Sequence, residues 1–266
     1  MPNLFTQVQR EARQDTRVQA LCRACKDGRE ESFTFSMAFE PIVNVSAGNI
    51  FAYEALVRGS MSETTAGVMR NVTPENLYAF DQTCRVKAIT LAVCLDLAKM
   101  GAVLSINVVP GAIYSPVARL RLTLETADKV GFPPDRLMFE VTEGEKVHDI
   151  PHVQAIVDEY WRRGTKMAID DVGAGFSGLS LLADLSVDVI KLDTALTHHM
   201  SQRPVARAIV RSMVDLADSL GVQLVVECVE EVESYKVLVD LGVTLMQGNL
   251  LPRPAYEALP EFTLSA

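Results

Sequence analysis

Two adjacent aspartates, Asp170 and Asp171, follow an apolar run and precede a glycine-rich segment in the stretch MAIDDVGAGF. An ionised carboxylate at the end of a buried strand has lost much of its hydration, so it requires a cation, an arginine or backbone N–H donors. Two carboxylates side by side strengthen that requirement. The same requirement for a partner applies to the other charged residues that end apolar runs.

Polar side chains end, or nearly end, most of the β-type runs of this chain. In order along the sequence they are Glu54, Asn107, Glu140, Asp170, Asp171, Lys191, Glu227 and Gln247. Any one of them can be a turn or helix-capping residue, and for Asp171 or Gln247 alone that interpretation is favoured. As a set, however, the five carboxylates would repel one another strongly unless cations neutralise them.

The chemical type of these candidate ligands indicates which cation the site would prefer. Carboxylate and amide oxygens without histidine or cysteine favour a hard ion, Mg²⁺ or Mn²⁺, and this many acids implies two ions, with Asp170 as a possible bridge. Two ions about 4 Å apart activate a water and stabilise the leaving oxygen in phosphodiester cleavage. Lys191 would position or deprotonate that water, or neutralise phosphoryl oxygens. The alternative role for Lys191 is a structural counter-ion to the carboxylates.

The elements that must position these residues alternate between β-type and helical runs. Two strands precede Gly59, over 32–45 and 50–57, with a turn at 46–49 between them. A long amphipathic helix is predicted from Asn76 to about Met100, with Thr73 as its N-cap. Six further strands are predicted at 103–107, 137–141, 166–170, 187–191, 222–227 and 243–247. The helices between them are predicted at about 115–130, 150–163, 178–184, 204–220 and 231–241.

Eight strands that alternate with helices and are rich in Val, Ile and Leu favour an α/β fold of the TIM-like (β/α)8 barrel type over an open sheet. The hairpin makes the barrel atypical, because one strand near the N-terminus would run antiparallel. The carboxyl ends of barrel strands converge on one mouth, so the polar residues are expected to face one cavity. We expect residues 31–266 to form the barrel and residues 1–30 an N-terminal helical arm.

Composition narrows the class of partner and the location. The 266 residues are 48% hydrophobic, 22% charged and carry a formal net charge of −9, which argues against a nucleic-acid polymer as partner. No apolar run is long enough to span a bilayer and the N-terminus lacks a secretory segment, so we expect no membrane partner and a cytoplasmic location. Five scattered cysteines favour reduced thiols, and Cys22 and Cys25 are interpreted as small residues of a helix.

Ordered sequence blocks extend this interpretation over most of the chain. They are FEPIV at 39–43, YEALVR at 53–58, SIN at 105–107, FEVTE at 139–143, DDVGAGFS at 170–177, IKLD at 190–193, ECVE at 227–230 and QGNLLPRP at 247–254. In this order the blocks resemble the EAL family of cyclic-di-GMP phosphodiesterases from about Phe35 to Pro254. The succession of blocks is highly specific, whereas a Glu-Ala-Leu triplet alone would carry no information.

The resemblance implies a barrel that hydrolyses cyclic-di-GMP to linear pGpG with two Mg²⁺ or Mn²⁺ ions. By position, the ligands of one ion would be Glu54, Asn107, Glu140 and Asp170, and those around the other would be Asp170, Asp171 and Glu227. The glycine-rich segment at 173–178 would bend over this site as a lid. In the family this segment also supports dimerisation, so a homodimer is expected.

The same resemblance implies roles outside the ligand set. Lys191 would serve the nucleophilic water, Gln247 would orient the site, and Glu143 would anchor the loop after Asp171. The residues implied to lie near the substrate are Arg58, which would meet a phosphate, Asn107 and Glu40.

The chain departs from the family pattern at several positions. Glu40 stands where the family usually has Gln, and it adds negative charge beside an anionic ligand. Val172 and Ala174 alter the lid segment. Cys228, Asn249 and Pro252 also differ from the pattern, and none of these changes removes an implied metal ligand.

Three functions are compatible with the sequence. The first is an active phosphodiesterase, favoured by the complete set of acids and by Lys191. The second is a receptor that binds cyclic-di-GMP without turnover and signals through a protein partner, favoured by Glu40 and the altered lid. The third is a barrel lyase or aldolase with Lys191 as a Schiff-base amine. This reaction gives the five carboxylates no role.

Overall fold

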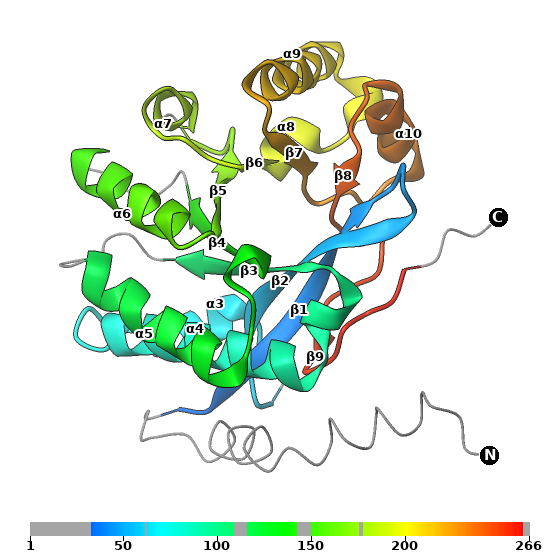
Figure 1. The fold of residues 1–266 in the computed structure, drawn as a ribbon. Coiled ribbons are helices and arrows are strands. Elements are labelled where there is room, and N and C mark those ends of the chain that lie inside the picture. The colour runs from blue at the N-terminus through cyan, green and yellow to red at the C-terminus, as the bar shows by residue number, and fades with distance from the viewer. Residues whose placement is uncertain (1–32, 62, 109–115, 143–149, 176–177, 263–266) are drawn as a thin grey trace, which may run out of the picture.

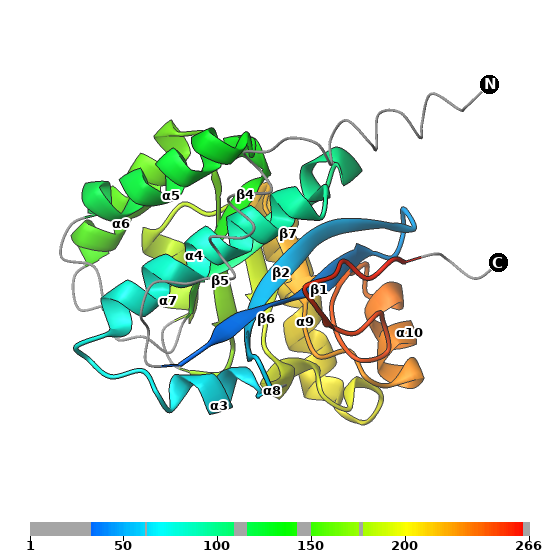
Figure 2. The same cartoon turned by 90° about the horizontal axis from the view of Figure 1, so that it is seen from below.

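The computed structural model describes residues 33–61, 63–108, 116–142, 150–175 and 178–262. In these ranges nine strands form one sheet, in the order β2-β3-β4-β5-β6-β7-β8-β1-β9, and a further pairing of β2 with β1 closes it. Strands β1 to β8 make a barrel, and the longer helices cover its outer surface (Figure 1, Figure 2). The expected TIM-like (β/α)8 barrel is confirmed. The arm expected over residues 1–30 lies outside the described residues.

The first two strands, β1 (Phe35–Asn44) and β2 (Asn49–Gly59), form the expected hairpin. Its turn begins at Asn44, whose Oδ1 accepts hydrogen bonds from Ser46 Oγ at 2.8 Å and from Ala47 N at 2.9 Å. Hydrogen bonds of this kind from an asparagine side chain stabilise a reversal of the chain. β1 is antiparallel to β2 and also to β8 (Leu245–Met246), so it is the antiparallel strand that the sequence predicts.

The other barrel strands pair in parallel, each with the next one along the chain. They are β3 (Val103–Val108), β4 (Leu137–Thr142), β5 (Lys166–Val172), β6 (Val189–Leu192) and β7 (Gln223–Val226). The longer helices are α4 (Leu77–Cys94), α5 (Pro116–Val130), α6 (Ile150–Arg162), α7 (Gly178–Asp184), α9 (Pro204–Leu220) and α10 (Val232–Asp240). Three elements too short to show a sequence period were not predicted, namely α3 (Thr65–Met69), α8 (Thr194–Thr197) and β9 (Ala255–Tyr256).

The predicted long helix is shorter than expected at both ends. α4 begins at Leu77 with Asn76 as N-cap, and the Asn76 side chain does not cap the helix. Asn76 Oδ1 instead accepts a hydrogen bond from Thr73 N at 2.7 Å within the preceding turn. It ends at Cys94, since Asp96 adopts a left-handed conformation with φ +59° that an α-helix cannot contain. The prediction of Thr73 as N-cap and of a helix continuing to Met100 was wrong.

One expectation about the cysteines was also wrong. Cys94, at the end of α4, is disulfide-bonded, whereas reduced thiols were expected throughout. An odd number of cysteines shows only that at least one lacks a partner within the chain, so it does not decide the state of the others.

None of the helices in the described ranges combines the length and the apolar character that a bilayer crossing requires.

Inside the barrel, each of the eight strands β1 to β8 contributes one apolar side chain to a common layer. This apolar layer consists of Ile42, Ala52, Val103, Met138, Ala168, Val189, Val225 and Leu245. All eight side chains are buried. Because side chains alternate along a strand, the residue two positions away on each strand must point into the barrel as well.

Candidate metal centre at the barrel mouth

The next inward-facing layer, toward the carboxyl ends of the parallel strands, is entirely polar. This polar layer consists of Glu40, Glu54, Ser105, Glu140, Asp170, Lys191, Glu227 and Gln247. Each member lies two residues from a member of the apolar layer, and on the antiparallel β1 the step runs backward, from Ile42 to Glu40. The two-residue period of a strand therefore gathers these polar groups at one level of the barrel.

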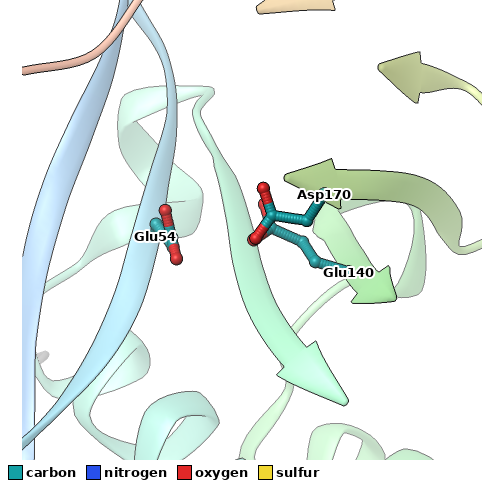
Figure 3. A group of neighbouring side chains, drawn as sticks. All are labelled: Glu54, Glu140 and Asp170. Atoms are coloured by element: carbon teal, nitrogen blue, oxygen red, sulfur yellow. The ribbon is translucent and has the colours of Figure 1, made fainter. Parts of the chain in front are cut away.

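The ammonium of Lys191 is fully buried within the polar layer. Its Nζ lies 3.0 Å from Glu54 Oε2 and 2.9 Å from Glu140 Oε2. It also lies 3.2 Å from Asp170 Oδ1 and 2.7 Å from Glu227 Oε1. Figure 3 shows the carboxylates of Glu140 and Asp170 side by side, with that of Glu54 facing them. One ammonium cannot balance four ionised carboxylates, so full ionisation of the layer would leave an excess of negative charge.

Neutral side chains hold two of these acids in place. Asn107 Nδ2 donates to Glu54 Oε1 at 2.8 Å, and Gln247 Nε2 donates to Glu54 Oε2 at 2.9 Å. Ser105 Oγ donates a short hydrogen bond to Glu140 Oε1. Asn107 is predicted to be a metal ligand, and for that role it would present its amide oxygen, which is separate from the nitrogen that donates to Glu54.

Asp170 and Asp171 lie close to the same site although they are consecutive residues. An undistorted strand would send their side chains to opposite faces of the sheet. The pairing of β5 with β6 is irregular between Ile169 and Val172, and Asp171 adopts φ +57°. The Asp171 N–H also donates to Asp170 Oδ1 at 2.9 Å. This bulge redirects Asp171, which explains how adjacent acids can serve one cluster.

Two groups of acids have the spacing that a metal ion requires. They are Glu54, Glu140 and Asp170, and Asp170, Asp171 and Glu227, and within each group the ligand atoms lie within 4.8 Å of one another. Asp170 belongs to both groups, as a bridging ligand must. Both groups offer only oxygen, which suits a hard divalent cation. Gln247 Oε1 is buried and has no hydrogen-bond partner within the described ranges, so it offers an acceptor for a bound molecule.

The electrostatic surroundings shift the protonation of these groups. Burial raises the pKa of Glu140 well above its usual range, with Glu54 and Asp170 adding to the shift against the opposing effect of Lys191. Burial also raises the pKa of Asp171 to about 6, helped by Asp170, and that of Glu227 to about 8, in spite of Lys191. The pKa of Lys191 is raised well above normal, because the surrounding carboxylates outweigh the effect of its own burial. Lys191 is therefore a charged ammonium at neutral pH.

These shifts predict that metal affinity depends on pH. The pKa values of Asp171 and Glu227 are higher in the folded chain than in the unfolded chain. The stability that their bound protons contribute is therefore present at low pH. It is lost as the pH rises through about 6 for Asp171 and through about 8 for Glu227. Metal ligation requires the ionised form, so an incoming ion displaces those protons. We expect the Kd for Mn²⁺ to fall by up to about tenfold per pH unit between about pH 6 and about pH 8, and then to level off.

This dependence can be measured by titrating Mn²⁺ at several pH values and detecting the free ion by electron paramagnetic resonance. The Glu227→Gln variant is the matched control, because it removes the acid whose pKa is raised to about 8 and should flatten the upper part of the curve. An affinity that is constant across this pH range would show that the acids are already ionised without metal.

The residues predicted beside the substrate lie around the mouth. Glu40 faces Glu54 across the hairpin and is partly buried; burial and then Glu54 raise its pKa. Arg58 is also partly buried, and its Nη1 donates to Val57 O at 2.8 Å and to Thr65 Oγ1 at 2.7 Å, at the start of α3. Glu143, the predicted loop anchor, lies outside the described residues.

Two glycines beside the site are required by its backbone. Gly173, directly after β5, has φ +104°, and a Cβ there would lie 2.3 Å from Leu196 Cδ1. Gly248 follows Gln247 with φ +143°, and a Cβ there would lie 2.2 Å from Val229 N. A side chain at either position would displace the segment that carries Asp171 or Gln247. The chain turns at Gly173, and residues 176–177 of the predicted lid segment lie outside the described residues.

Ser105 is the member of the polar layer that the sequence interpretation missed. In this strand only Asn107, the last polar residue, was predicted to belong to the site. Residues 105 and 107 share one face of β3, so strand alternation counted from Asn107 would have identified Ser105.

The fold and the site together define a closed α/β barrel whose mouth carries a buried, oxygen-rich acidic cluster suited to divalent metal ions. The chain belongs to the EAL domain family, whose model matches residues 19–254. This agrees with the family resemblance of the sequence blocks.

Two solved structures show how far the likeness extends. A standalone EAL protein from Vibrio cholerae O395 in its c-di-GMP bound form has a TM-score of 0.83 and 43% identity, over 88% of this chain and 98% of that one. Klebsiella pneumoniae BlrP1, in a manganese and c-di-GMP complex, has a TM-score of 0.81 and 31% identity, over 88% of this chain and 59% of that one.

Among curated proteins, the chain is similar to the cyclic di-GMP phosphodiesterase RocR of Pseudomonas aeruginosa. The two are 37% identical over 125 residues, which are 47% of this chain and 32% of RocR. The chain spans only 55% and 32% of the first two curated relatives that it matches. The activity of a whole relative therefore does not transfer to this chain without an experiment.

Proposed function

We propose that this chain is a metal-dependent phosphodiesterase that hydrolyses cyclic-di-GMP to linear pGpG. The observation that carries the proposal is the pair of acid groups that share Asp170 beside the buried ammonium of Lys191. A cyclic dinucleotide is anionic, so it would be repelled by these acids unless divalent ions lie among them. The named activity of RocR and the ligand of the two solved neighbours support the choice of substrate.

The described residues fit two Mg²⁺ or Mn²⁺ ions. The first ion would be held by Glu54, Glu140, Asp170 and the amide oxygen of Asn107, and the second by Asp170, Asp171 and Glu227. Manganese in the BlrP1 complex supports this choice of metal. When bound, such a pair of ions supplies the positive charge that polarises a phosphodiester and lowers the pKa of water.

The chain's own groups then position the reactants. Lys191 keeps its proton at neutral pH, so it would orient the attacking water or stabilise the phosphoryl oxygens as a hydrogen-bond donor. Gln247 Oε1 has no hydrogen-bond partner among the described residues, so it would accept a hydrogen bond from a bound water or from the substrate. Arg58, on the same face of β2 as Glu54 and nearer the mouth, would meet a substrate phosphate.

The charge of Lys191 also bears on the lyase alternative. A Schiff base forms only from a neutral amine, and an ammonium that contacts four carboxylates is held in the wrong protonation state for that reaction. This argues against a lyase or aldolase.

Incubation with cyclic-di-GMP and Mn²⁺ or Mg²⁺, with products separated by chromatography, tests the proposal. Formation of pGpG that stops when EDTA is added supports the phosphodiesterase. Tight binding without product supports the second candidate, a receptor that signals through a protein partner, which the acidic Glu40 favours. An adduct at Lys191 trapped by borohydride would support the lyase instead.

Glu40 gives a prediction about affinity. Replacing Glu40 by glutamine removes a negative charge that would face an anionic substrate. We expect KM for cyclic-di-GMP to fall by about fivefold, the equivalent of about 1 kcal/mol. The effect should increase with pH, because the pKa of Glu40 is raised by burial and only its ionised form repels the substrate.

Steady-state kinetics at two pH values would measure this effect. The control is Glu233→Gln, which removes an exposed acid that pairs with Lys236 at 3.0 Å on α10. An unchanged KM for Glu40→Gln at both pH values would remove Glu40 from the substrate site.

The homodimer and the cytoplasmic location expected from the sequence remain part of this proposal. Sedimentation of the purified chain with and without cyclic-di-GMP would measure the first.

A further inference from the structure

Strand β3 lies between the two strands that carry the buried glutamates of the first metal group. Its neighbours are β2, which carries Glu54, and β4, which carries Glu140. Two side chains of β3 point to these glutamates, one to each side. Asn107 donates to Glu54 Oε1, and Ser105 donates to Glu140 Oε1.

The two glutamates are held in the same way. Each gives one carboxylate oxygen to a neutral donor of β3 and the other oxygen to the Lys191 ammonium. A carboxylate held at one oxygen can present only the other oxygen to the centre of the cluster. Glu140 and Ser105 have no exposed surface, so bulk solvent does not compete with the serine hydroxyl for this oxygen.

We infer that Ser105 is a positioning residue for the metal centre, which fixes the rotation of the Glu140 carboxylate so that Oε2 alone faces the ion. This inference rests on the proposed metal centre. The hydroxyl does not contact the ion or the substrate. It acts through Glu140, and removing such a supporting hydrogen bond typically weakens metal affinity by about tenfold to a hundredfold.

The test compares the Ser105→Ala and Ser105→Thr variants with the wild-type chain by Mn²⁺ titration, using electron paramagnetic resonance to detect the free ion. We expect Ser105→Ala to raise the Kd for Mn²⁺ by about tenfold and to change the line shape of the bound ion. Ser105→Thr keeps the hydroxyl and should bind Mn²⁺ within about threefold of the wild type. The melting temperature without metal is recorded for every variant.

A matched control separates positioning from general stability. Ser234 is also buried, and its Oγ donates to a different glutamate, Glu231 Oε2, at 3.0 Å. Ser234→Ala should leave the Kd for Mn²⁺ unchanged even if it lowers the melting temperature. An unchanged Kd in Ser105→Ala would overturn the inference, and so would equal weakening in the alanine and threonine variants. A wild-type chain that binds no Mn²⁺ would instead overturn the proposed metal centre itself.

Discussion

Replacing Glu54 by glutamine is expected to lower kcat for cyclic-di-GMP hydrolysis by about 10³-fold, the equivalent of about 4 kcal/mol in the barrier. Glutamine keeps the size of the side chain, and its single oxygen can still accept a hydrogen bond from Asn107 or from Gln247. It removes the negative charge and one ligand of the first metal group. The loss would therefore report on metal-dependent chemistry and not on folding.

The matched control for Glu54→Gln is Glu159→Gln. Glu159 is buried as well, but it pairs with Arg162, the last residue of α6, and with Arg163 directly after the helix. We expect Glu159→Gln to keep kcat within about twofold of the wild type. A Glu54→Gln variant that retained more than about a tenth of the activity would show that the acid group is not the catalytic centre.

The second large effect is expected on stability, from Lys191→Met. Removing the ammonium leaves four carboxylates without their common cation in the buried polar layer. Removing one partner of a buried ion pair typically costs about 3–5 kcal/mol, so the metal-free variant should unfold at a much lower urea concentration. Mn²⁺ should restore much of the lost stability, because it supplies positive charge at the same place. Activity should be lost as well.

Urea unfolding in EDTA and in Mn²⁺ measures this effect. At about pH 5 the difference from the wild type should shrink, because the raised pKa values allow the carboxylates to become neutral by taking up protons. Lys166→Met, at the start of β5 and outside the polar layer, is the control for loss of a lysine. A Lys191→Met variant as stable as the wild type at neutral pH without metal would refute the role of Lys191 as the internal counter-ion.

Much of the site follows from the sequence because one rule generates it. Strand ends in a barrel converge, and polar residues at the ends of apolar runs therefore meet. The rule identified Glu54, Glu140, Lys191 and Glu227 without knowledge of any distance. The antiparallel strand could also be predicted, because the residue types at 46–49 are typical of a turn between two strands.

The parts that sequence could not give depend on local backbone geometry. Nothing in the residue types around Asp171 shows the bulge that turns it toward Asp170. The left-handed conformation of Asp96, which ends α4, is likewise invisible in an amphipathic pattern that continues to Met100. Ser105 was not predicted, because the sequence does not distinguish a small serine that only packs inside a strand from one whose hydroxyl contacts an acid. The structure shows the contact of its hydroxyl with Glu140.

The central claim is that divalent ions belong among the acids of the polar layer, and a crystal grown with Mn²⁺ tests it most directly. Anomalous scattering should show two peaks about 4 Å apart, one among Glu54, Glu140 and Asp170 and the other among Asp170, Asp171 and Glu227. A map without peaks, in which the carboxylates still close around the Lys191 ammonium at saturating Mn²⁺, would contradict the account.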